Sequence, residues 1–227
     1  MKLRHLLLCL LAACQSAPPA ETESVKPGIN DSFLGEDFEL QKYIDRFEGE
    51  SREIAREHVA LTAALNLEPG MEVADVGAGT GLFLPDFSHG VGPEGTVYAV
   101  DLAPDFIEHM KERIAEEQLT NVKPILCTEK SAELPKNSVD RIFICDTYHH
   151  FEYPLSSLWS LRRALRPGGE LLLIDFERIP GITAEWLLDH VRAPREVFIA
   201  EFEQSGFELI EEVHVDGFTE NYVLRFR

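Results

Sequence analysis

Basic residues are scarce in this sequence. Lys and Arg together number 21, against 40 Asp and Glu, so the formal net charge at pH 7 is −19. A surface this acidic repels phosphate backbones, and the basic residues occur singly or in pairs such as Arg162-Arg163, without forming a stripe. The charge pattern therefore argues against a nucleic-acid partner.

Cysteine is also rare, and the sequence has no internal repeat. Of its 4 cysteines, Cys127 and Cys145 lie in apolar runs and are expected to be buried thiols on strands, so no disulfide framework is predicted. The chain has 227 residues, of which 44% are hydrophobic and 27% charged. These values suit one soluble α/β domain and give no sign of a second domain.

The first 25 residues differ from the rest. A basic start precedes an apolar run over residues 6–14, which is too short to span a bilayer but typical of a secretion signal. Leu11-Ala12-Ala13-Cys14 resembles the bacterial lipobox, in which the cysteine is lipidated and becomes the first residue. Residues 15–24 are small and polar and contain proline, which is typical of a flexible tether.

This leader predicts both organisation and location. We expect a signal peptide over 1–13, a lipidated Cys14 with a tether over 14–40, and a folded domain over 41–227. The protein would then be lipid-anchored in the cell envelope. If the leader is not processed, the alternative is a cytoplasmic protein.

Strand and helix patterns alternate between residues 71 and 206. Strands are predicted at 71–76, 96–100, 122–127, 139–145 and 170–176. Helices are predicted at 50–66, 81–89, from Pro104 onward, and at 154–165, 183–191 and 195–205. The alternation predicts a Rossmann-like α/β fold, whose seven-stranded, mostly parallel sheet has helices on both faces. The last two strands, 207–215 and 221–226, have a short connection and should form an antiparallel hairpin at the sheet edge.

Residues 73–81 read VADVGAGTG, an apolar run that ends in an acid and is followed by three glycines at alternate positions. Glycine lets a ligand approach bare backbone, and ligands of such sheets bind at the carboxyl ends of the strands. A triphosphate loop would continue with Gly-Lys-Ser/Thr, but Leu82-Phe83 follow Gly81. A dinucleotide fingerprint would place its third glycine at Leu82. The triphosphate loop is therefore excluded, and the dinucleotide fingerprint is matched only in part.

Two acids at the strand ends indicate the charge of the ligand. Asp75 stands just before the glycines, where a carboxylate suits a positively charged ligand. Asp101 ends the second strand and can accept hydrogen bonds from both hydroxyls of a ribose. A ligand with a ribose and a cationic, amino-acid-like part fits, and S-adenosylmethionine is such a ligand.

Three stretches carry a resemblance to a known family. VADVGAGTG resembles the first motif of the class I S-adenosylmethionine-dependent methyltransferases, in the broad group that includes the ubiquinone/menaquinone-type C-methyltransferases. VYAVDLAP is similar to their ribose-binding second strand, and ALRPGGELLLIDF to their late turn and fifth strand. The resemblance covers about residues 45–227.

The resemblance implies a set of cofactor contacts. Around the methionine end it places Asp75, Gly77, Gly79 and Gly81. It places Asp101 at the ribose and Leu102 against the adenine.

The remaining cofactor contacts follow the third and fourth strands. Relatives often have Gly-Asp-Ala-x-x-Leu-Pro after the third strand, and its aspartate binds the adenine amino group. Here that position is Lys130, a departure that leaves Glu129 or a backbone carbonyl to make the contact. Asp146, after the fourth strand, is expected to complete the cofactor site.

The segment after the fourth strand also indicates the acceptor. It lacks the Asn-Pro-Pro-Tyr of DNA and glutamine N-methyltransferases and carries His149 and His150. Either histidine is a candidate base for a phenol or an acidic carbon. Alternatively, both cap the next helix and wall the pocket. No metal site is predicted, because Asp146 and the two histidines are close neighbours without a distant carboxylate.

Two further groups of residues have open roles. Tyr43, Phe47 and Arg52 precede the core and could form a lid, as in the family, or an amphipathic helix packed on the sheet. The segment after the fifth strand carries Trp186, His190, Arg192 and Arg195. Its two arginines could meet an anionic acceptor or pair with surface carboxylates.

The leading hypothesis is methyl transfer from S-adenosylmethionine to a small-molecule acceptor. A membrane-tethered cofactor-binding protein without turnover is the first alternative. A nicotinamide-dependent oxidoreductase is the second, and both Leu82 and Asp75 argue against it.

Overall fold

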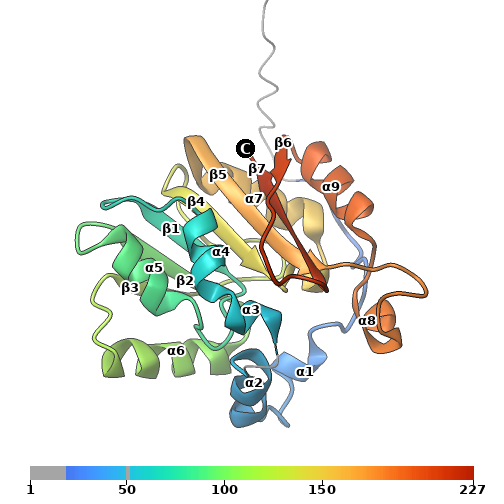
Figure 1. Cartoon of the computed structure of the whole chain (residues 1–227), viewed down its shortest axis with the longest axis horizontal. Helices are drawn as coiled ribbons and strands as arrows, with labels where there is room; N and C mark the ends of the chain where they lie inside the picture. The colour runs from blue at the N-terminus through green and yellow to red at the C-terminus, as the bar shows by residue number, and fades with distance from the viewer. Residues whose placement is uncertain (1–18, 50–51) are drawn as a thin grey trace, which may run out of the picture.

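The computed structural model describes residues 19–49 and 52–227, which form one seven-stranded sheet of order β3-β2-β1-β4-β5-β7-β6 (Figure 1). The strands are β1 Glu72–Val76, β2 Thr96–Asp101, β3 Val122–Leu126, β4 Val139–Cys145, β5 Leu165–Phe176, β6 Leu209–Glu212 and β7 Asn221–Phe226. The first five pair in parallel, and β7 is antiparallel to both β5 and β6. The predicted fold class and its edge hairpin are confirmed.

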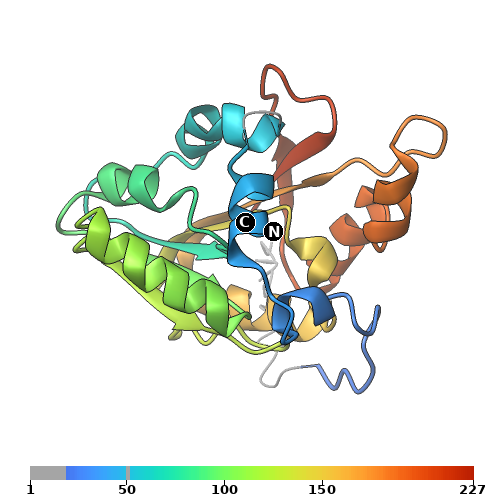
Figure 2. The same cartoon turned by 90° about the horizontal axis from the view of Figure 1, so that it is seen from below.

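Helices cover both faces of the sheet (Figure 2). The helices are α1 Asp31–Leu34, α2 Leu40–Phe47, α3 Glu53–Arg56, α4 His58–Ala64, α5 Leu84–Val91, α6 Pro104–Glu116, the 3-10 helix η1 Tyr148–His150, α7 Pro154–Ala164, α8 Glu185–His190 and α9 Arg195–Gln204. Side chains alternate along a strand, so Leu171 and Leu173 pack with α7 and α9 while Leu172 and Ile174 pack with α3 to α6. Because both faces are buried, the strands read as continuous apolar runs.

Three expected boundaries differ from the structure. The helix expected over 50–66 is two short helices in its described part, α3 and α4, which meet at Glu57. Strand β5 begins at Leu165, because Leu165 pairs with Val139 while residues 166–169 loop out before the next pair, Arg141 with Glu170. The predicted Pro-Gly-Gly turn is thus an interruption inside a longer strand. Strand β6 is shorter than the predicted 207–215.

Residues 19–49, called here the N-terminal strap, lie along the domain. The Glu21 carboxylate accepts hydrogen bonds from the backbone N–H groups of Leu155 and Ser156, at 3.1 and 2.5 Å. The Lys26 ammonium donates to the carbonyl oxygens of Asp189 and His190, both at 2.7 Å. The described part of the expected tether, residues 19–40, is therefore attached to the domain and does not stand free.

Aromatic packing explains why the strap is held. Phe33 and Phe38 lie 6.0 and 5.1 Å from the ring of Phe106 at the start of α6, and Tyr43 lies 5.5 Å from it. Burial of these rings favours the attached state. The small, polar composition of residues 15–24 could not reveal this, since the aromatic residues follow that stretch.

The predicted signal peptide and Cys14 lie outside the described residues. Within residues 19–49 and 52–227, no helix combines the length and apolar character needed to cross a membrane.

Glu53 ties the start of α3 to the start of β7. Its buried carboxylate accepts backbone hydrogen bonds from Thr219, Glu220 and Asn221, at 2.8, 3.1 and 2.7 Å. Charge-assisted hydrogen bonds of this kind are the stronger ones in proteins. One carboxylate therefore holds the edge hairpin against the segment that follows the strap.

We predict that Glu53→Ala lowers the free energy of unfolding by about 3 kcal/mol, because it leaves the buried N–H of Asn221 without its partner. Urea unfolding measures this change. Glu112→Ala removes an exposed carboxylate from α6 and serves as the matched control, expected to change stability by less than about 0.5 kcal/mol. Equal stability of the two variants would show that the Glu53 contacts do not hold the hairpin.

Candidate functional site

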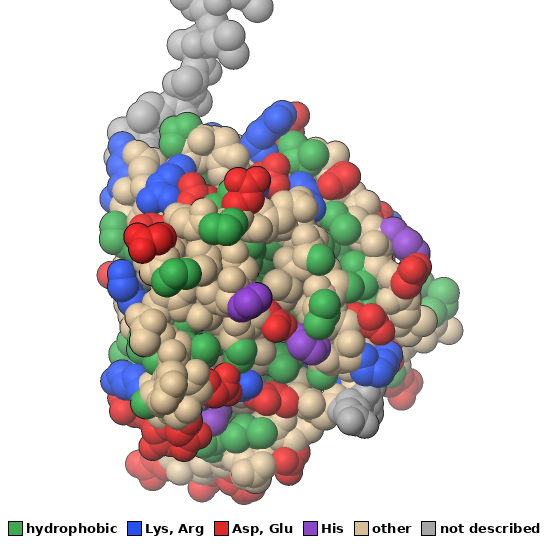
Figure 3. All heavy atoms as spheres, turned by 60° about the vertical axis from the view of Figure 1, so that its left-hand side comes forward, with side chains coloured by type: hydrophobic (Ala, Val, Ile, Leu, Met, Phe, Trp, Pro, Cys, Tyr) green, Lys and Arg blue, Asp and Glu red, His purple; other side chains and the backbone are tan. Residues whose placement is uncertain are grey.

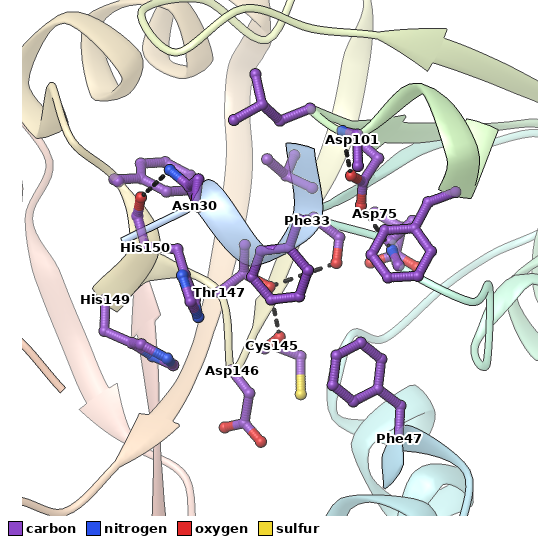
Figure 4. A pocket seen from close by; sticks show the side chains of 18 of the residues that line it. Asn30, Phe33, Phe47, Asp75, Asp101, Cys145, Asp146, Thr147, His149 and His150 are labelled. Carbon is purple, nitrogen blue, oxygen red and sulfur yellow. Dashed lines mark hydrogen bonds between the residues drawn. The ribbon is translucent and has the colours of Figure 1, made fainter. Parts of the chain in front are cut away.

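A cavity of about 350 Å³ opens at the carboxyl ends of the parallel strands. It lies where the chain order reverses, because β1 has β2 on one side and β4 on the other. In Figure 4, Asp75 and Asp101 lie on one side of the cavity and His149 and His150 on the other, with Phe33 of the strap between them. The cavity therefore has an end near β1 and β2, called here the cofactor end, and an end near η1, called the acceptor end.

Most predicted site residues line this cavity. They are Asp75, Gly77, Gly79, Asp101, Leu102, Glu129, Asp146, His149 and His150. Gly81 does not line it. Its φ of +81° and its position against Leu84, which a Cβ atom would approach to 2.8 Å, make Gly81 part of the turn into α5.

The glycine loop runs from β1 to α5 and presents bare backbone to the cavity. Gly77 and Gly79 have φ of +77° and +55°, which favour glycine. A Cβ atom at Gly77 would come within 2.1 Å of the Thr147 side chain, so this glycine allows the loop to pack on the end of β4. A Cβ atom at Gly79 would meet nothing closer than 3.6 Å. The neighbour at 3.6 Å is the Phe47 ring of the strap, so Gly79 presents its backbone to the cavity where the strap covers it.

Asp101 fixes the shape of this loop. One carboxylate oxygen accepts a hydrogen bond from the Gly79 N–H at 2.7 Å, and the other from the Ala103 N–H at 2.9 Å. Burial raises the pKa of Asp101, and the backbone N–H donors of Ala103 and Gly79 oppose that rise. Each oxygen keeps a further lone pair, which is what the predicted contact with ribose hydroxyls requires.

Asp75 has a different environment. It is buried, and its Oδ2 has no hydrogen-bond partner among the described residues. Burial, with a smaller contribution from the charge of Asp101, raises the pKa of Asp75 to about 8. An acid of this kind is neutral at pH 7 in the free protein and can take up a negative charge when a cation binds beside it.

The predicted adenine end is less well defined. Leu102 and Glu129 line the cavity, but the Glu129 carbonyl accepts a hydrogen bond from the Ser157 hydroxyl at 3.0 Å. Lys130 donates to the carbonyl oxygen of Glu21 at 3.0 Å and lies 4.1 Å from the ring centre of Tyr153. The residue that departs from the family pattern therefore holds the strap. The adenine contact of Glu129 stays a prediction.

Asp146 is occupied by two partners in the chain. Its carboxylate forms an ion pair with Arg52 and accepts a hydrogen bond from the Asn221 amide. Burial raises the pKa of Asp146, and the charge of Arg52 opposes this. The Arg52 guanidinium also lies 5.4 Å from the ring centre of Phe47. Asp146 thus fastens the residues just beyond the strap to the end of β4, while its cofactor contact stays a prediction.

The lid alternative for the residues ahead of the core agrees with these contacts. Phe47 and Arg52 line the cavity, and Tyr43 packs on Phe106 behind them. The strap therefore covers the site at its open side and does not pack on the face of the sheet.

At the acceptor end, His149 is held by a buried carboxylate. Its Nδ1 lies 2.8 Å from Asp175 Oδ1, and its backbone N–H donates to Asp175 Oδ2 at 3.1 Å. The side chains of His149 and Asp175 are 1% and 0% exposed, so solvent does not compete for this pair. Asp175 lies in β5 and fixes the orientation of the ring.

His150 and His190 lie beside His149. Burial, with the neighbouring histidines, lowers the pKa of His150 to about 2 and that of His190 to about 4. Both rings are therefore neutral at pH 7. An imidazole whose pKa is near 2 binds a proton too weakly to be an effective general base, so the base hypothesis for His150 loses support.

The two core thiols also line the cavity. Cys145 is the last residue of β4, as predicted. Cys127 was predicted to lie on a strand, but it directly follows the end of β3. Both are unpaired and partly buried. Burial raises the pKa of Cys127 to about 12 and that of Cys145 well above its ordinary value, so neither thiol ionises at neutral pH.

The arginines after β5 pair with carboxylates. Arg192 contacts Glu201 at 2.6 Å, and Arg195 contacts Glu177 and Glu212 at 2.9 and 3.2 Å. Of the two roles considered for these arginines, pairing with carboxylates is thus the one that the structure shows. On the face shown in Figure 3, Lys and Arg side chains stand singly among acidic ones and form no continuous basic band.

Several site residues were missed at the level of sequence. They are Asn30, Phe33, Thr147 and Asp175. A signal existed for Asp175, because it is a carboxylate inside the apolar run of residues 171–176. Asn30 donates to the carbonyl oxygen of His150 at 3.1 Å, a contact between residues 120 positions apart that no local pattern could indicate.

Comparisons with known proteins agree with this geometry. A family model described as a methyltransferase domain matches residues 67–215. Because the match spans more than half of the sequence, the chain belongs to this methyltransferase domain family.

Among curated proteins, the chain is similar to the ubiquinone/menaquinone biosynthesis C-methyltransferases UbiE of Bordetella avium and Burkholderia cenocepacia. The identities are 29% over 115 residues and 25% over 117 residues, respectively. These matches cover 50% and 52% of this chain, and 44% and 48% of the two relatives. The chain thus spans about half the length of the curated relatives it matches.

Among solved structures, the chain is similar to a SAM dependent methyltransferase from Aquifex aeolicus, with a TM-score of 0.73, 28% identity and coverage of 83% of this chain and 98% of that one. Fibrillarin of Aeropyrum pernix, solved with natively bound S-adenosyl-L-methionine, shares the fold with a TM-score of 0.53 and 18% identity over 75% of this chain and 74% of its own. The predicted class, a methyltransferase domain of the S-adenosylmethionine-dependent kind, is confirmed.

The fold alone does not set the reaction. The [4+2]-cyclase SpnF is also similar, with a TM-score of 0.64 and 17% identity over 76% of this chain and 81% of its own. The acceptor must therefore be inferred from the particular side chains of the site.

We predict that Gly79→Ala weakens binding of S-adenosylhomocysteine by about tenfold or more, because the new methyl group occupies space beside the ligand. Gly168→Ala is the matched control. Gly168 also has a positive φ, so both variants carry a backbone strain of about 1–2 kcal/mol, but Gly168 lies in the looped-out part of β5 and does not line the cavity. Calorimetric titration of both variants separates strain from ligand contact. Equal affinities in the two variants would mean that the loop at Gly79 is only a turn.

Proposed function

We propose that this chain transfers a methyl group from S-adenosylmethionine to a small, largely apolar acceptor. The observation that carries the cofactor part is the pair of buried carboxylates flanking bare glycine backbone. Asp75, with an unpaired oxygen, suits the cationic methionine end, and Asp101 suits the ribose. Neither arrangement suits a pyrophosphate.

Methyl transfer asks little covalent chemistry of the protein. A lone pair of the acceptor attacks the methyl carbon, the bond from carbon to the sulfonium sulfur breaks, and its electron pair stays on sulfur as a neutral thioether. The protein has to align the two partners and exclude competing water. The strap supplies this enclosure through Phe33 and Phe47, which line the cavity.

The side chains at the acceptor end support a small, largely apolar acceptor. Its walls include Phe33, Phe151, Phe176 and Trp186, together with the histidine rings and the polar side chains of Asn30, Arg46 and Glu152. An enclosed aromatic wall favours a small aromatic or other apolar molecule over a macromolecule. The alternative of binding without turnover predicts cofactor binding but no methylated product from any such molecule.

We further propose that the chain is exported and lipidated at Cys14, which would place the domain at the cell envelope. The support is the order of basic start, apolar run, Leu-Ala-Ala-Cys and polar stretch. A membrane-anchored enzyme would meet lipid-soluble acceptors at high local concentration, which agrees with the apolar acceptor end.

Binding of the cationic cofactor at pH 7 is expected to release a proton from Asp75. The pKa of this carboxyl is about 8 in the free protein and falls when a positive charge binds beside it. Affinity should therefore rise as the pH increases toward about 8, above which the amino group of the ligand loses its own charge. Calorimetry at pH 7 in buffers of different ionisation enthalpy measures the proton released.

Asp75→Asn provides the control, because the amino group of the ligand titrates equally in both proteins. This variant should release one proton fewer and bind about tenfold or more weakly, through loss of a charge-assisted hydrogen bond. Binding of NADH without binding of S-adenosylmethionine would overturn the proposed function.

For the leader, we predict that the full chain incorporates radiolabelled palmitate and fractionates with membranes, whereas Cys14→Ser does neither. Each buried CH₂ of an acyl chain contributes about 0.8 kcal/mol, so several chains would anchor the domain firmly. Labelling followed by cell fractionation makes the measurement. Unlabelled, soluble, full-length protein would contradict the anchor and leave the cytoplasmic alternative.

A further inference from the structure

Three histidine side chains converge at the acceptor end of the cavity. The ring centres of His149 and His150 are 4.4 Å apart, and each lies 4.9 Å from the ring centre of His190. One nitrogen from each ring can be chosen so that all three lie within 4.8 Å of one another. Among the described residues, no other group of three or more histidine, cysteine or acidic side chains meets this criterion. All three line the cavity.

His149 has the environment of a metal ligand. Asp175 holds its Nδ1 at 2.8 Å, which leaves Nε2 free of that contact. Histidines that bind metal commonly donate their other ring N–H to a carboxylate, which fixes the tautomer and raises the basicity of the ligating nitrogen. Figure 4 shows the His149 and His150 rings next to each other, both from η1.

His150 carries an unexplained polar atom. Its Nδ1 is buried and has no hydrogen-bond partner among the residues that the structure describes. A buried polar group without a partner costs free energy and is rare in folded proteins. A ligand at the centre of the three rings would give the His150 ring the polar partner that its Nδ1 lacks.

His190 comes from a distant part of the chain, yet it is held in place. It is the last residue of α8, and Lys26 of the strap donates to its carbonyl oxygen at 2.7 Å. The Arg178 guanidinium donates to the carbonyl oxygens of Leu188 and Val191, at 2.9 and 3.1 Å. These cations hold the end of α8 against the strap and the segment after β5, so the backbone that carries the third ring is positioned before any ligand arrives.

We propose that His149, His150 and His190 bind a first-row divalent metal ion, with Zn²⁺ preferred, at the acceptor end of the cavity. Imidazole nitrogen suits zinc and its neighbours in the first transition row. Tetrahedral zinc, with bonds of about 2.0–2.1 Å, separates its ligand nitrogens by about 3.4 Å. The rings would have to close by somewhat more than an ångström, which side-chain rotation supplies.

Three histidines leave a fourth position open, which is the ligand count of a catalytic zinc site. Two carboxylates of the same segment, Asp146 and Glu152, already have partners, which are Arg52 and Asn221 for the first and Ser24 and Asn30 for the second. The open position therefore faces the cavity, where an acceptor oxygen or sulfur can bind. The metal would lower the pKa of that group, its proton would pass to solvent, and the resulting lone pair would face the methyl group. This reaction role rests on the proposed function, whereas metal binding itself does not.

The test is a competition titration of the chelator-treated full chain with Zn²⁺ and a chromophoric chelator, without cofactor. One Zn²⁺ per chain is expected. His190→Ala should weaken its binding by about 100-fold or more, and Asp175→Asn, which acts only through His149, by about 10–100-fold. His214→Ala removes a histidine that is 88% exposed and outside the cluster, so it should bind zinc like the unchanged protein.

Co²⁺ provides a second readout, because its visible absorption reports tetrahedral nitrogen ligands directly. Circular dichroism and S-adenosylhomocysteine binding by His190→Ala show that this variant is folded. Zinc affinity that is absent, or equal in His190→Ala and His214→Ala, would overturn the metal site and leave the three rings as a wall of the pocket. Zinc binding without cofactor binding would instead contradict the proposed function alone.

Discussion

Four aspartates lie buried at the carboxyl ends of neighbouring parallel strands, and a buried carboxylate is costly unless something compensates its charge. The chain compensates three of them. Asp101 accepts backbone N–H groups, Asp146 pairs with Arg52 and Asn221, and Asp175 holds His149. Asp75 alone keeps an oxygen without a partner among the described residues. The uncompensated acid is therefore the place at which the proposed cationic cofactor would complete the site.

The same edge of the sheet holds both ends of the cavity, one for each of the two proposed ligands. Its cofactor end consists of strand ends and the glycine loop, which the register of β1, β2 and β4 fixes. Its acceptor end consists of η1, α8 and the strap, which are held together by contacts between distant segments, such as Asn30 with His150 and Lys26 with α8. The cofactor end is therefore determined by backbone pairing and the acceptor end by packing between distant segments.

This division also decides what the sequence could predict. Local apolar runs and the glycine and proline residues between them predict strands β1 to β5 and the loop at Gly77 and Gly79. The same local patterns single out Asp75 and Asp101, and these four residues line the cavity. The attachment of residues 19–40, the partner of His149 and the meeting of His190 with His150 depend on contacts between residues far apart in the chain. No periodicity records such contacts, so the tether was expected to stand free and no cluster of three histidines was foreseen.

The strap has a further consequence during synthesis. It leaves the ribosome early, but Asn30 must wait for His150, and Lys26 for His190, which is made 164 residues later. Until then Phe33 lacks the His150 ring, which lies 5.2 Å from it in the folded chain. The order of translation thus delays closure of the cavity by the strap until α8 has emerged.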